Sequence, residues 1–244
     1  MNLIINADDF GISKGVNYGI YDAHIYGVVT STSLMVTMPE VKHALGLAKK
    51  IPSLKIGLHL NITFGQPITN CKSLLKPNGN FYKPLENPNQ DKFDEEEIYQ
   101  EFLAQYNLFV KVMGKKPTHL DSHLYAHQKY EKGKRAVIRL AIEMDIPVRA
   151  LDIEGYKTSK FLDFFKYKKG DDLIAIFEEN IPNIKNHEIC ELMVHPGYVD
   201  DFLLEFSTYN LPRVEEIEIL TSDKLKTLLQ ENNINLVNFE FLRR

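Results

Sequence analysis

Short apolar segments alternate with longer amphipathic ones along most of this chain. The apolar segments are rich in β-branched residues and indicate strands, and the segments between them carry apolar residues at helical spacing. Because helices separate the strands, the strands are expected to run parallel. The alternation therefore predicts an α/β fold with about seven parallel strands, at residues 3–7, 28–36, 55–60, 118–122, 146–151, 189–194 and 234–238.

Capping signals bound several of the expected helices. Ser13 fits the N-cap of a helix that ends at Gly27, and Pro39 fits the start of the next helix. Asp94 begins a longer helix that Gly114 ends. Further helices are expected over residues 136–144, 161–167 and 173–181, the last two within a stretch, 152–187, that has no clear place in the alternation.

The alternation lapses between residues 61 and 93, where prolines, glycines and asparagines are frequent. A connection of this length far exceeds the usual ~4–6 residues, so it is a candidate lid or binding loop. The chain shows no internal repeat and no composition shift that would mark a linker. We therefore expect one domain over residues 1–244.

Composition argues against several classes of protein. The formal net charge of −4 arises from intermixed acids and bases, so the basic surface that nucleic acid requires is missing. No segment approaches the ~20 apolar residues of a membrane span, and the first residues lack the basic and apolar regions of a signal peptide. Two cysteines, Cys71 and Cys190, indicate free thiols in a reducing compartment. We expect a cytoplasmic protein that binds neither nucleic acid nor membrane.

Polar residues collect at the carboxyl ends of the expected strands. In parallel α/β folds these ends form the functional face, because the loops that follow them converge there. A carboxylate and two imidazoles from separate strands can form a three-ligand metal site with open positions, and a second carboxylate and histidine can serve as general base and acid. The residues concerned are Asp8, Asp9, His59, Asp121, His123, Arg149 and His195.

Taken singly, most of these residues have ordinary structural explanations. Asp8 and Asp9 could form a turn or N-cap, His59 could be a hydrogen-bonded core histidine, and His195 precedes a Pro-Gly turn. The segment 119–127 is harder to explain by burial, because it holds three histidines and an aspartate. The residues alone leave open which of those histidines binds a metal. Arg213 and Glu216, near an expected helix start, are only weak candidates.

Five short motifs, in order along residues 2 to about 200, resemble the YdjC-like carbohydrate deacetylases, a family that includes chitooligosaccharide (chitin disaccharide) deacetylase. The motifs are Asn6-Ala7-Asp8-Asp9-Phe10-Gly11, Gly27-Val28-Val29-Thr30-Ser31-Thr32, Gly57-Leu58-His59-Leu60, Pro117-Thr118-His119-Leu120-Asp121-Ser122-His123 and Leu192-Met193-Val194-His195-Pro196-Gly197. The combination is specific, although no single motif is.

The resemblance implies a distorted, TIM-like β/α barrel and a divalent metal, commonly magnesium, with zinc as the alternative. It implies that Asp9, His59 and His123 are the metal ligands, that Asp8 is the base acting on water and that His195 protonates the departing amine. The substrate class it implies is an N-acetylglucosamine-containing oligosaccharide, such as chitobiose or its phosphate, from which acetate is released. The chain departs from the family where further histidines often follow His123, because it keeps only His127.

Contacts to the sugar are expected from aromatic and charged side chains on the same rim. The chain has no tryptophan, so tyrosine or phenylalanine must stack on sugar faces. Arg149 is expected to bind a phosphate or hydroxyl, with pairing to an acid as the alternative. Other substrate contacts are expected from Tyr125, His127 and Tyr198, with Phe64 and Tyr82 as further stacking candidates by position. The partner is then a small N-acetylated saccharide, and a homodimer is one option for the assembly.

Three other functions remain open on sequence grounds. Two histidines and one carboxylate also form the facial triad of non-haem iron oxygenases, although an oxygenase has no evident use for Asp8. Another amidohydrolase or a phosphoesterase on a similar barrel would tend to use two metals. A non-catalytic sugar-binding protein would keep the pocket without turnover.

Overall fold

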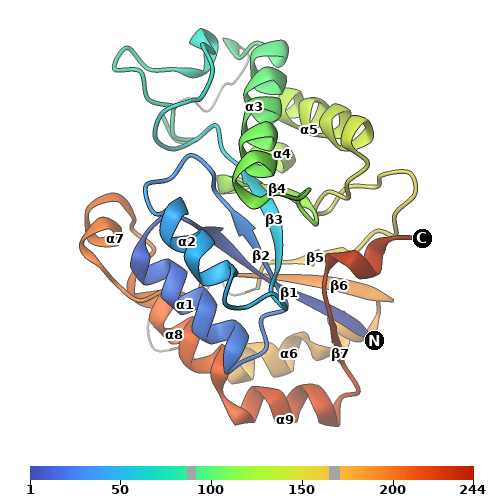
Figure 1. Cartoon of the computed structure of the whole chain (residues 1–244). Coiled ribbons are helices and arrows are strands. Elements are labelled where there is room, and N and C mark those ends of the chain that lie inside the picture. The colour runs from blue at the N-terminus through green and yellow to red at the C-terminus, as the bar shows by residue number, and fades with distance from the viewer. Residues whose placement is uncertain (87–91, 165–170) are drawn as a thin grey trace.

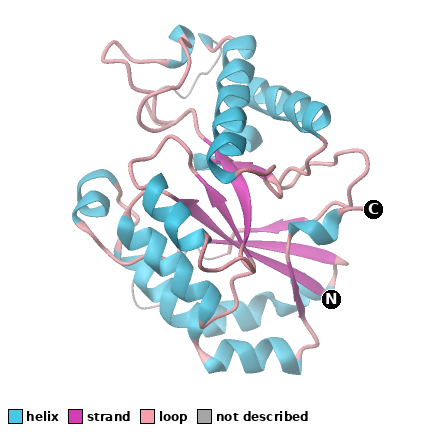
Figure 2. Ribbon diagram, viewed as in Figure 1, coloured by secondary structure: helices cyan, strands magenta, loops and turns pink. Residues whose placement is uncertain are grey.

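The computed structural model describes residues 1–86, 92–164 and 171–244. Within these residues the centre of the molecule is a sheet of seven parallel strands that curls into a half-barrel, with helices around it (Figures 1 and 2). The predicted α/β fold and its seven parallel strands are therefore confirmed. The strands are β1 (Asn2–Phe10), β2 (Ser31–Leu34), β3 (Lys55–Leu60), β4 (Leu120–Ser122), β5 (Lys160–Leu162), β6 (Ile189–Val194) and β7 (Asn235–Val237).

Strand β1 is the hub of the sheet, whose order is β4-β3-β2-β1-β6-β5. One edge of β1 pairs with β6 over residues 2–7. The other edge of β1 pairs with two strands in succession. It pairs with β7 over residues 2–4 and with β2 from Asn6 onward. This change of partner along β1 splits the sheet, which accounts for a distorted barrel.

Helices cover the outside of this half-barrel. Helices α3 and α5 pack together on one side, and α1 packs against both α2 and α8 (Figure 1). Nowhere in the described ranges is there a helix with the length and hydrophobicity needed to cross a bilayer. The α-helices are α1 (Lys14–Ile25), α2 (Val41–Ala48), α3 (Glu95–Met113), α4 (Ala126–Lys129), α5 (Glu131–Met144), α6 (Leu173–Lys185), α7 (Asp201–Phe206), α8 (Leu211–Thr221) and α9 (Asp223–Glu231), with short 3₁₀ turns η1 (Lys72–Leu74), η3 (His123–Tyr125) and η4 (Phe239–Leu242).

The capping signals at Ser13, Asp94 and Gly114 act as predicted, whereas Pro39 lies two residues before the first residue of α2, Val41. The Ser13 hydroxyl accepts a hydrogen bond from the N–H of Val16 at the start of α1. The Asp94 carboxylate accepts two backbone N–H groups at the start of α3. Gly114 ends α3 with a φ of 69°, the left-handed conformation that suits glycine.

The fifth strand lies elsewhere than predicted. Residues 146–151 form only an isolated bridge between Val148 and Leu120, so the predicted strand is wrong. Pro147 has no N–H to donate, and the chain turns away at Ala150, where φ is 58°. The actual fifth strand, β5, overlaps the predicted helix 161–167, whose last three residues lie outside the described ranges. The predicted helix 173–181 is confirmed as α6.

The first half of the 61–93 loop is held against α3. The buried carboxylate of Glu101 accepts hydrogen bonds from the backbone N–H groups of Ile68 and Thr69 and from the Thr69 hydroxyl. The amide of Gln105 accepts the N–H of Asn61 and donates to its carbonyl. Residues 87–91 of the loop are not described. These contacts fix the segment that follows β3, next to the candidate site.

Candidate active site

Two consecutive aspartates, Asp8 and Asp9, both reach one histidine. In a regular strand adjacent side chains point to opposite faces of the sheet. Here the register between β1 and β2 shifts between Ala7 and Phe10, and Asp9 has a left-handed φ of 72°. As a result one carboxylate oxygen of Asp8 lies 4.0 Å from Nδ1 of His59, and one of Asp9 lies 3.5 Å from Nε2. The irregular backbone thus places two acids on one rim.

Asp9, His59 and His123, the ligand set that the family resemblance implies and that we call the metal trio, lie close together. Oδ1 of Asp9 lies 3.5 Å from Nε2 of His59 and 4.0 Å from Nε2 of His123. Within the described part of the chain this oxygen is buried and has no hydrogen-bond partner. Buried carboxylate oxygens are nearly always paired, so an unpaired one facing two imidazoles marks a place for a cation.

The second nitrogen of each imidazole in the metal trio is held by the protein. Nδ1 of His59 donates to Oδ1 of Asp121 at 2.8 Å, and the Ser33 hydroxyl lies 3.1 Å from the same nitrogen. Nδ1 of His123 hydrogen-bonds the Thr63 hydroxyl at 2.8 Å. Such bonds fix the ring orientation and leave Nε2 for a metal, which is the usual arrangement around metal-binding histidines.

The three side chains of the metal trio differ in their charge before any metal binds. Burial alone would raise the pKa of Asp9, but the positive charge of Arg213 and the neighbouring histidines hold it well below its usual range. Burial would lower the pKa of His59, yet the carboxylates of Asp121 and Asp8 outweigh it and raise that pKa to about 9. Burial lowers the pKa of His123 to about 4. In neutral solution the carboxyl group of Asp9 is therefore ionised, and the imidazole of His123 is uncharged.

A second group, which we call the Arg149 network, lies directly beside the metal trio and consists of Arg149, Asp8, Asp121 and Glu191. Nη1 and Nη2 of Arg149 donate to the two oxygens of Asp8 at 2.7 and 2.6 Å. Its Nε donates to Glu191 at 2.6 Å, and Nη2 also lies 3.0 Å from Asp121. Every nitrogen of the guanidinium thus contacts a carboxylate. The sequence suggested that Arg149 binds a phosphate or hydroxyl of the substrate or, alternatively, pairs with an acid. In the structure it pairs with three acids.

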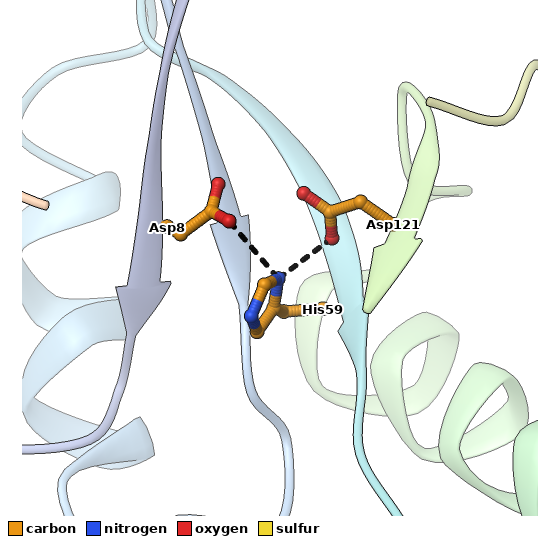
Figure 3. Close-up of side chains that lie close together, drawn as sticks. All are labelled: Asp8, His59 and Asp121. Carbon is orange, nitrogen blue, oxygen red and sulfur yellow. Dashed lines mark hydrogen bonds and ion pairs between the residues drawn. The ribbon is translucent and has the colours of Figure 1, made fainter. Parts of the chain in front are cut away.

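Asp8, His59 and Asp121 also have the spacing of a cation site. Their side chains point toward one another from β1, β3 and β4, with one ligand atom from each within 4.8 Å of the others (Figure 3). However, Arg149 already supplies the positive charge between Asp8 and Asp121, and Nδ1 of His59 is bonded to Asp121. A metal here would have to displace a buried guanidinium, whereas Oδ1 of Asp9 in the metal trio has no partner among the described residues.

The Arg149 network carries its own charge shifts. Burial would raise the pKa of Asp121, but Arg149 and His59 hold it well below its usual range. Burial raises the pKa of Glu191 to about 7, even though Arg149 opposes this shift. Asp8 and Asp121 thus neutralise Arg149 and His59, while Glu191 is poised between its two protonation states.

His195 follows β6 and presents its ring to the same rim. The ring packs edge-on against Tyr209, with centroids 5.6 Å apart. Neither ring nitrogen hydrogen-bonds a described residue, whereas Nδ1 of His59 and Nδ1 of His123 are each hydrogen-bonded. Burial lowers the pKa of His195, and the nearby carboxylates of Asp9 and Asp8 oppose this shift. An imidazole with free nitrogens beside two carboxylates is suited to proton transfer.

Sequence reasoning undervalued two residues of α8. Arg213 donates from Nη2 to Oδ2 of Asp9 at 2.6 Å, across 204 positions of sequence. Glu216 accepts the backbone N–H of His195 and the Tyr209 hydroxyl. Both side chains are buried, and burial raises the pKa of Glu216 to about 7. Both charged residues stand on the buried face of α8, where apolar residues are expected. That departure from the amphipathic pattern is the local feature of the sequence that could have indicated a functional role.

The remaining residues that the sequence suggested as substrate contacts are engaged with other parts of the protein. His127 is buried, with its ring bonded to the Ser122 hydroxyl and the Arg149 carbonyl. Tyr125, in a left-handed conformation with φ of 62°, donates to Asp163. Tyr198 donates to Asp22 on α1, which raises the pKa of its hydroxyl to about 12.

His119, the third histidine of the 119–127 segment, lies beneath the site. Its ring stacks on Phe239 with centroids 3.5 Å apart, and its Nε2 lies 3.6 Å from Asp121. Gly57 leaves room for this ring, since a Cβ there would lie 2.2 Å from Cε1 of His119. His119 therefore packs under Asp121 and takes no position in the metal trio.

Residues 2–231 match a family model described as YdjC-like protein. The chain belongs to the YdjC-like family. A YdjC-like relative named carbohydrate deacetylase 2, from Listeria innocua, is 46% identical over 243 residues, which is 98% of each chain. The carbohydrate deacetylase of Clostridium beijerinckii is 39% identical, covering 98% of this chain and 99% of its own. The family resemblance carried by the five motifs is thus confirmed.

Solved structures agree with this YdjC-like assignment. A proposed cellobiose-phosphate cleavage protein from Enterococcus faecalis superposes with a TM-score of 0.90 at 33% identity, covering 100% of this chain and 99% of its own. A peptidoglycan N-acetylglucosamine deacetylase superposes with a TM-score of 0.56 at 13% identity, which shows a common fold alone. The expectations of a distorted barrel and of a deacetylase enzyme are confirmed at the level of the YdjC-like family.

Proposed function

We propose that this chain is a metal-dependent deacetylase that removes the acetyl group from N-acetylglucosamine-containing oligosaccharides, such as chitobiose or its phosphate. The observation that carries the proposal is the buried, unpaired Oδ1 of Asp9 facing Nε2 of both His59 and His123. One carboxylate and two imidazoles leave open positions for water and substrate. When bound, a divalent metal polarises the acetamide carbonyl and lowers the pKa of water.

Asp8 is the proposed base. Its carboxylate lies within 4.0 Å of the His59 ring, so it adjoins the metal trio without belonging to it. Arg149 donates to both of its oxygens and the Asn6 amide also donates to Oδ1, so the second lone pair of Oδ2 is the one that can accept the proton of the attacking water. Arg149 thereby fixes the direction from which Asp8 approaches that water.

His195 is the proposed acid. Its lowered pKa makes the protonated imidazole a stronger acid, and the carboxylates of Asp9 and Asp8 stabilise that protonated form. A free ring nitrogen can therefore deliver a proton to the departing amine as the C–N bond breaks. The products are acetate and a free amino sugar.

Aromatic side chains next to His123 offer a surface for the sugar. Phe64 lies with its ring 6.1 Å from that of His123, and Phe202 and Phe206 of α7 pack edge-on against Phe64. Phe206 is 45% exposed. We infer that this Phe64 cluster receives the apolar face of a sugar ring, since the chain has no tryptophan for that role.

The metal needs separate testing. Two imidazoles and one carboxylate bind zinc-like ions better than magnesium, which prefers oxygen ligands, whereas the family resemblance favours magnesium. We therefore suggest assaying acetate release from N,N′-diacetylchitobiose and its phosphate with magnesium, zinc, cobalt and manganese in turn. Activity that survives removal of every divalent ion would exclude the metal trio as the catalytic centre.

Replacing Asp8 tests the mechanism. Asp8→Asn keeps the shape and can keep contacts to Arg149, but it cannot take up a proton. Acetate release should fall by roughly 10²–10⁴-fold, the usual contribution of a general base, while the metal still binds. Turnover at the wild-type rate would overturn the role of Asp8.

A further inference from the structure

Helix α8 sends two buried charged side chains into the site from outside the metal trio. Arg213 and Glu216, which we call the α8 brace, lie three residues apart and so share one face of the helix. They are 4% and 0% exposed. Helix α8 also buries the apolar side chains of Ile217, Ile219 and Leu220, and it packs against α1, α6 and α9. The burial of Arg213 and Glu216 calls for an explanation.

Arg213 fixes the orientation of the Asp9 carboxylate. Its Nη2 donates to Oδ2 of Asp9 at 2.6 Å, and its Nε donates to the Tyr209 carbonyl at 2.9 Å, so the guanidinium is held at two points. Because Oδ2 is engaged, Oδ1 is the oxygen that faces His59 and His123. Without Arg213 the carboxylate could rotate and offer either oxygen, or both.

Glu216 fixes His195 in a similar way. One of its oxygens accepts the backbone N–H of His195, and the other accepts the Tyr209 hydroxyl at 2.5 Å. The Tyr209 ring in turn packs against the His195 ring. A single carboxylate thus holds the backbone of His195 and the aromatic residue that confines its side chain.

We propose that the α8 brace positions the catalytic centre at two separate points, Arg213 by directing one oxygen of Asp9 toward the metal and Glu216 by holding His195 in place. Both are positioning residues, since each acts through another side chain. The Arg213 part rests on the proposed metal trio. The competing explanation is that both residues only attach α8 to the sheet.

Metal affinity tests Arg213 without any need for turnover. We suggest titrating metal-free protein with zinc and manganese by calorimetry, using Arg213→Met, Arg213→Lys and the exposed control Arg135→Met. The Met variant should bind metal roughly 10–100-fold more weakly, the usual effect of losing a residue that orients a metal ligand. The Lys variant should lose less, because it keeps one charged donor, and the control should match wild type.

Two results would overturn this part of the proposal. One is a folded Arg213→Met protein with unchanged metal affinity and a lower melting temperature, as a purely structural role requires. The other is tighter metal binding, which would mean that the positive charge of Arg213 matters more than its geometry. If the Met variant does not fold, the Lys variant alone tests the role of Arg213. Metal affinity equal to that of the wild type in the Lys variant would then contradict the proposal.

Kinetics with bound metal test Glu216. Glu216→Leu removes both acceptors, so kcat should fall by roughly 10–100-fold through misplacement of His195, with KM and metal affinity near wild type. Glu216→Gln keeps an acceptor for the His195 N–H and a partner for the Tyr209 hydroxyl, and should restore most of kcat. An unchanged kcat in the Leu variant, or a loss of metal affinity as large as in Arg213→Met, would refute separate roles. If no saccharide is deacetylated, the metal titration of the Arg213 variants still tests the role of Arg213, because it does not require turnover.

Discussion

Asp8 and Asp9 are neighbours in sequence, each is buried and each is bound by an arginine, yet their surroundings differ. Arg149 contacts both oxygens of Asp8 and also pairs with Asp121 and Glu191, so all of its nitrogens are used. Arg213 contacts one oxygen of Asp9 and leaves the other without a partner in the described structure. The first pair closes a network in which every nitrogen of Arg149 has a carboxylate partner, although Oε2 of Glu191 stays unpaired among the described residues. The second pair leaves one oxygen of Asp9 open toward two histidines.

This difference separates an aspartate that is held in place from an aspartate that is open to a ligand. A closed network of buried charges holds its members in place, because breaking any pair leaves an uncompensated charge. An open carboxylate oxygen that faces two imidazoles, as Oδ1 of Asp9 does, has the surroundings of a cation site. The unpaired Oε2 of Glu191 differs, because burial raises the pKa of Glu191 to about 7 and a proton can occupy it. Proximity alone does not make this distinction, since Asp8, His59 and Asp121 also lie within ligand spacing of one another.

Removing a member of the metal trio should give the largest effect. His123→Ala and His59→Ala each delete an imidazole that faces the open oxygen of Asp9, and should abolish stoichiometric metal binding together with turnover. Metal content after dialysis, measured by inductively coupled plasma mass spectrometry, checks this. His187→Ala, which changes a histidine outside the site, is the control. Wild-type metal content in either trio variant would place the cation elsewhere.

Breaking the closed network should affect folding more than metal binding. Arg149→Met leaves Asp8, Asp121 and Glu191 buried without their common cation, so the free energy of unfolding should drop by about 3–5 kcal/mol. Urea denaturation of the metal-free protein measures this, with the exposed Arg139→Met as a control of little effect. A variant as stable as wild type would show that the Arg149 network does not act as scaffold.

Metal binding should release a proton from His59 but none from His123. The pKa of His59 is raised to about 9 in the metal-free protein, so its imidazole is protonated at pH 7 and must lose a proton before Nε2 can bind. His123, with a pKa of about 4, is already neutral. Calorimetry in buffers of different ionisation enthalpy should show about one proton released per metal at pH 7, decreasing as the pH rises through about 9. Absence of proton release at pH 7 would argue against His59 as a ligand.

The smallest effect is expected from a change in the Phe64 cluster, which lies outside the two aspartate–arginine pairs. Phe206→Ala should raise KM by about 2- to 10-fold, as loss of about 0.5–1.5 kcal/mol of aromatic contact predicts, with kcat nearly unchanged. Phe241→Ala is a matched control, because Phe241 is 41% exposed on η4 whereas Phe206 is 45% exposed on α7. Equal KM values in the two variants would remove the Phe64 cluster from the sugar site.

The sequence predicted those parts of the fold that depend on contacts between neighbouring residues. The caps at Ser13, Asp94 and Gly114 depend on neighbouring backbone groups and could be predicted directly. The fifth strand could not, because a proline and a left-handed alanine end the pairing of residues 146–151 after one bridge. Strand β5 is only three residues long, too short for any periodicity to show.

Part of the site could likewise be predicted and part could not. Polar residues that follow strands, such as His59 and His195, are detectable because strand ends converge on one rim. Arg213 follows no strand and meets Asp9 across 204 positions, so only the packing of α8 brings them together. Thr63 similarly reaches His123 only because the 61–93 loop is held against α3.

The left-handed backbone of Asp9 implies a compromise between stability and activity. A non-glycine residue in this conformation costs roughly 1–2 kcal/mol. Selection for stability alone would favour glycine or a regular strand at this position, and either change would separate the two neighbouring acids. The chain therefore keeps a less stable first strand in order to keep its chemistry, and efforts to make this protein more robust should leave that position untouched.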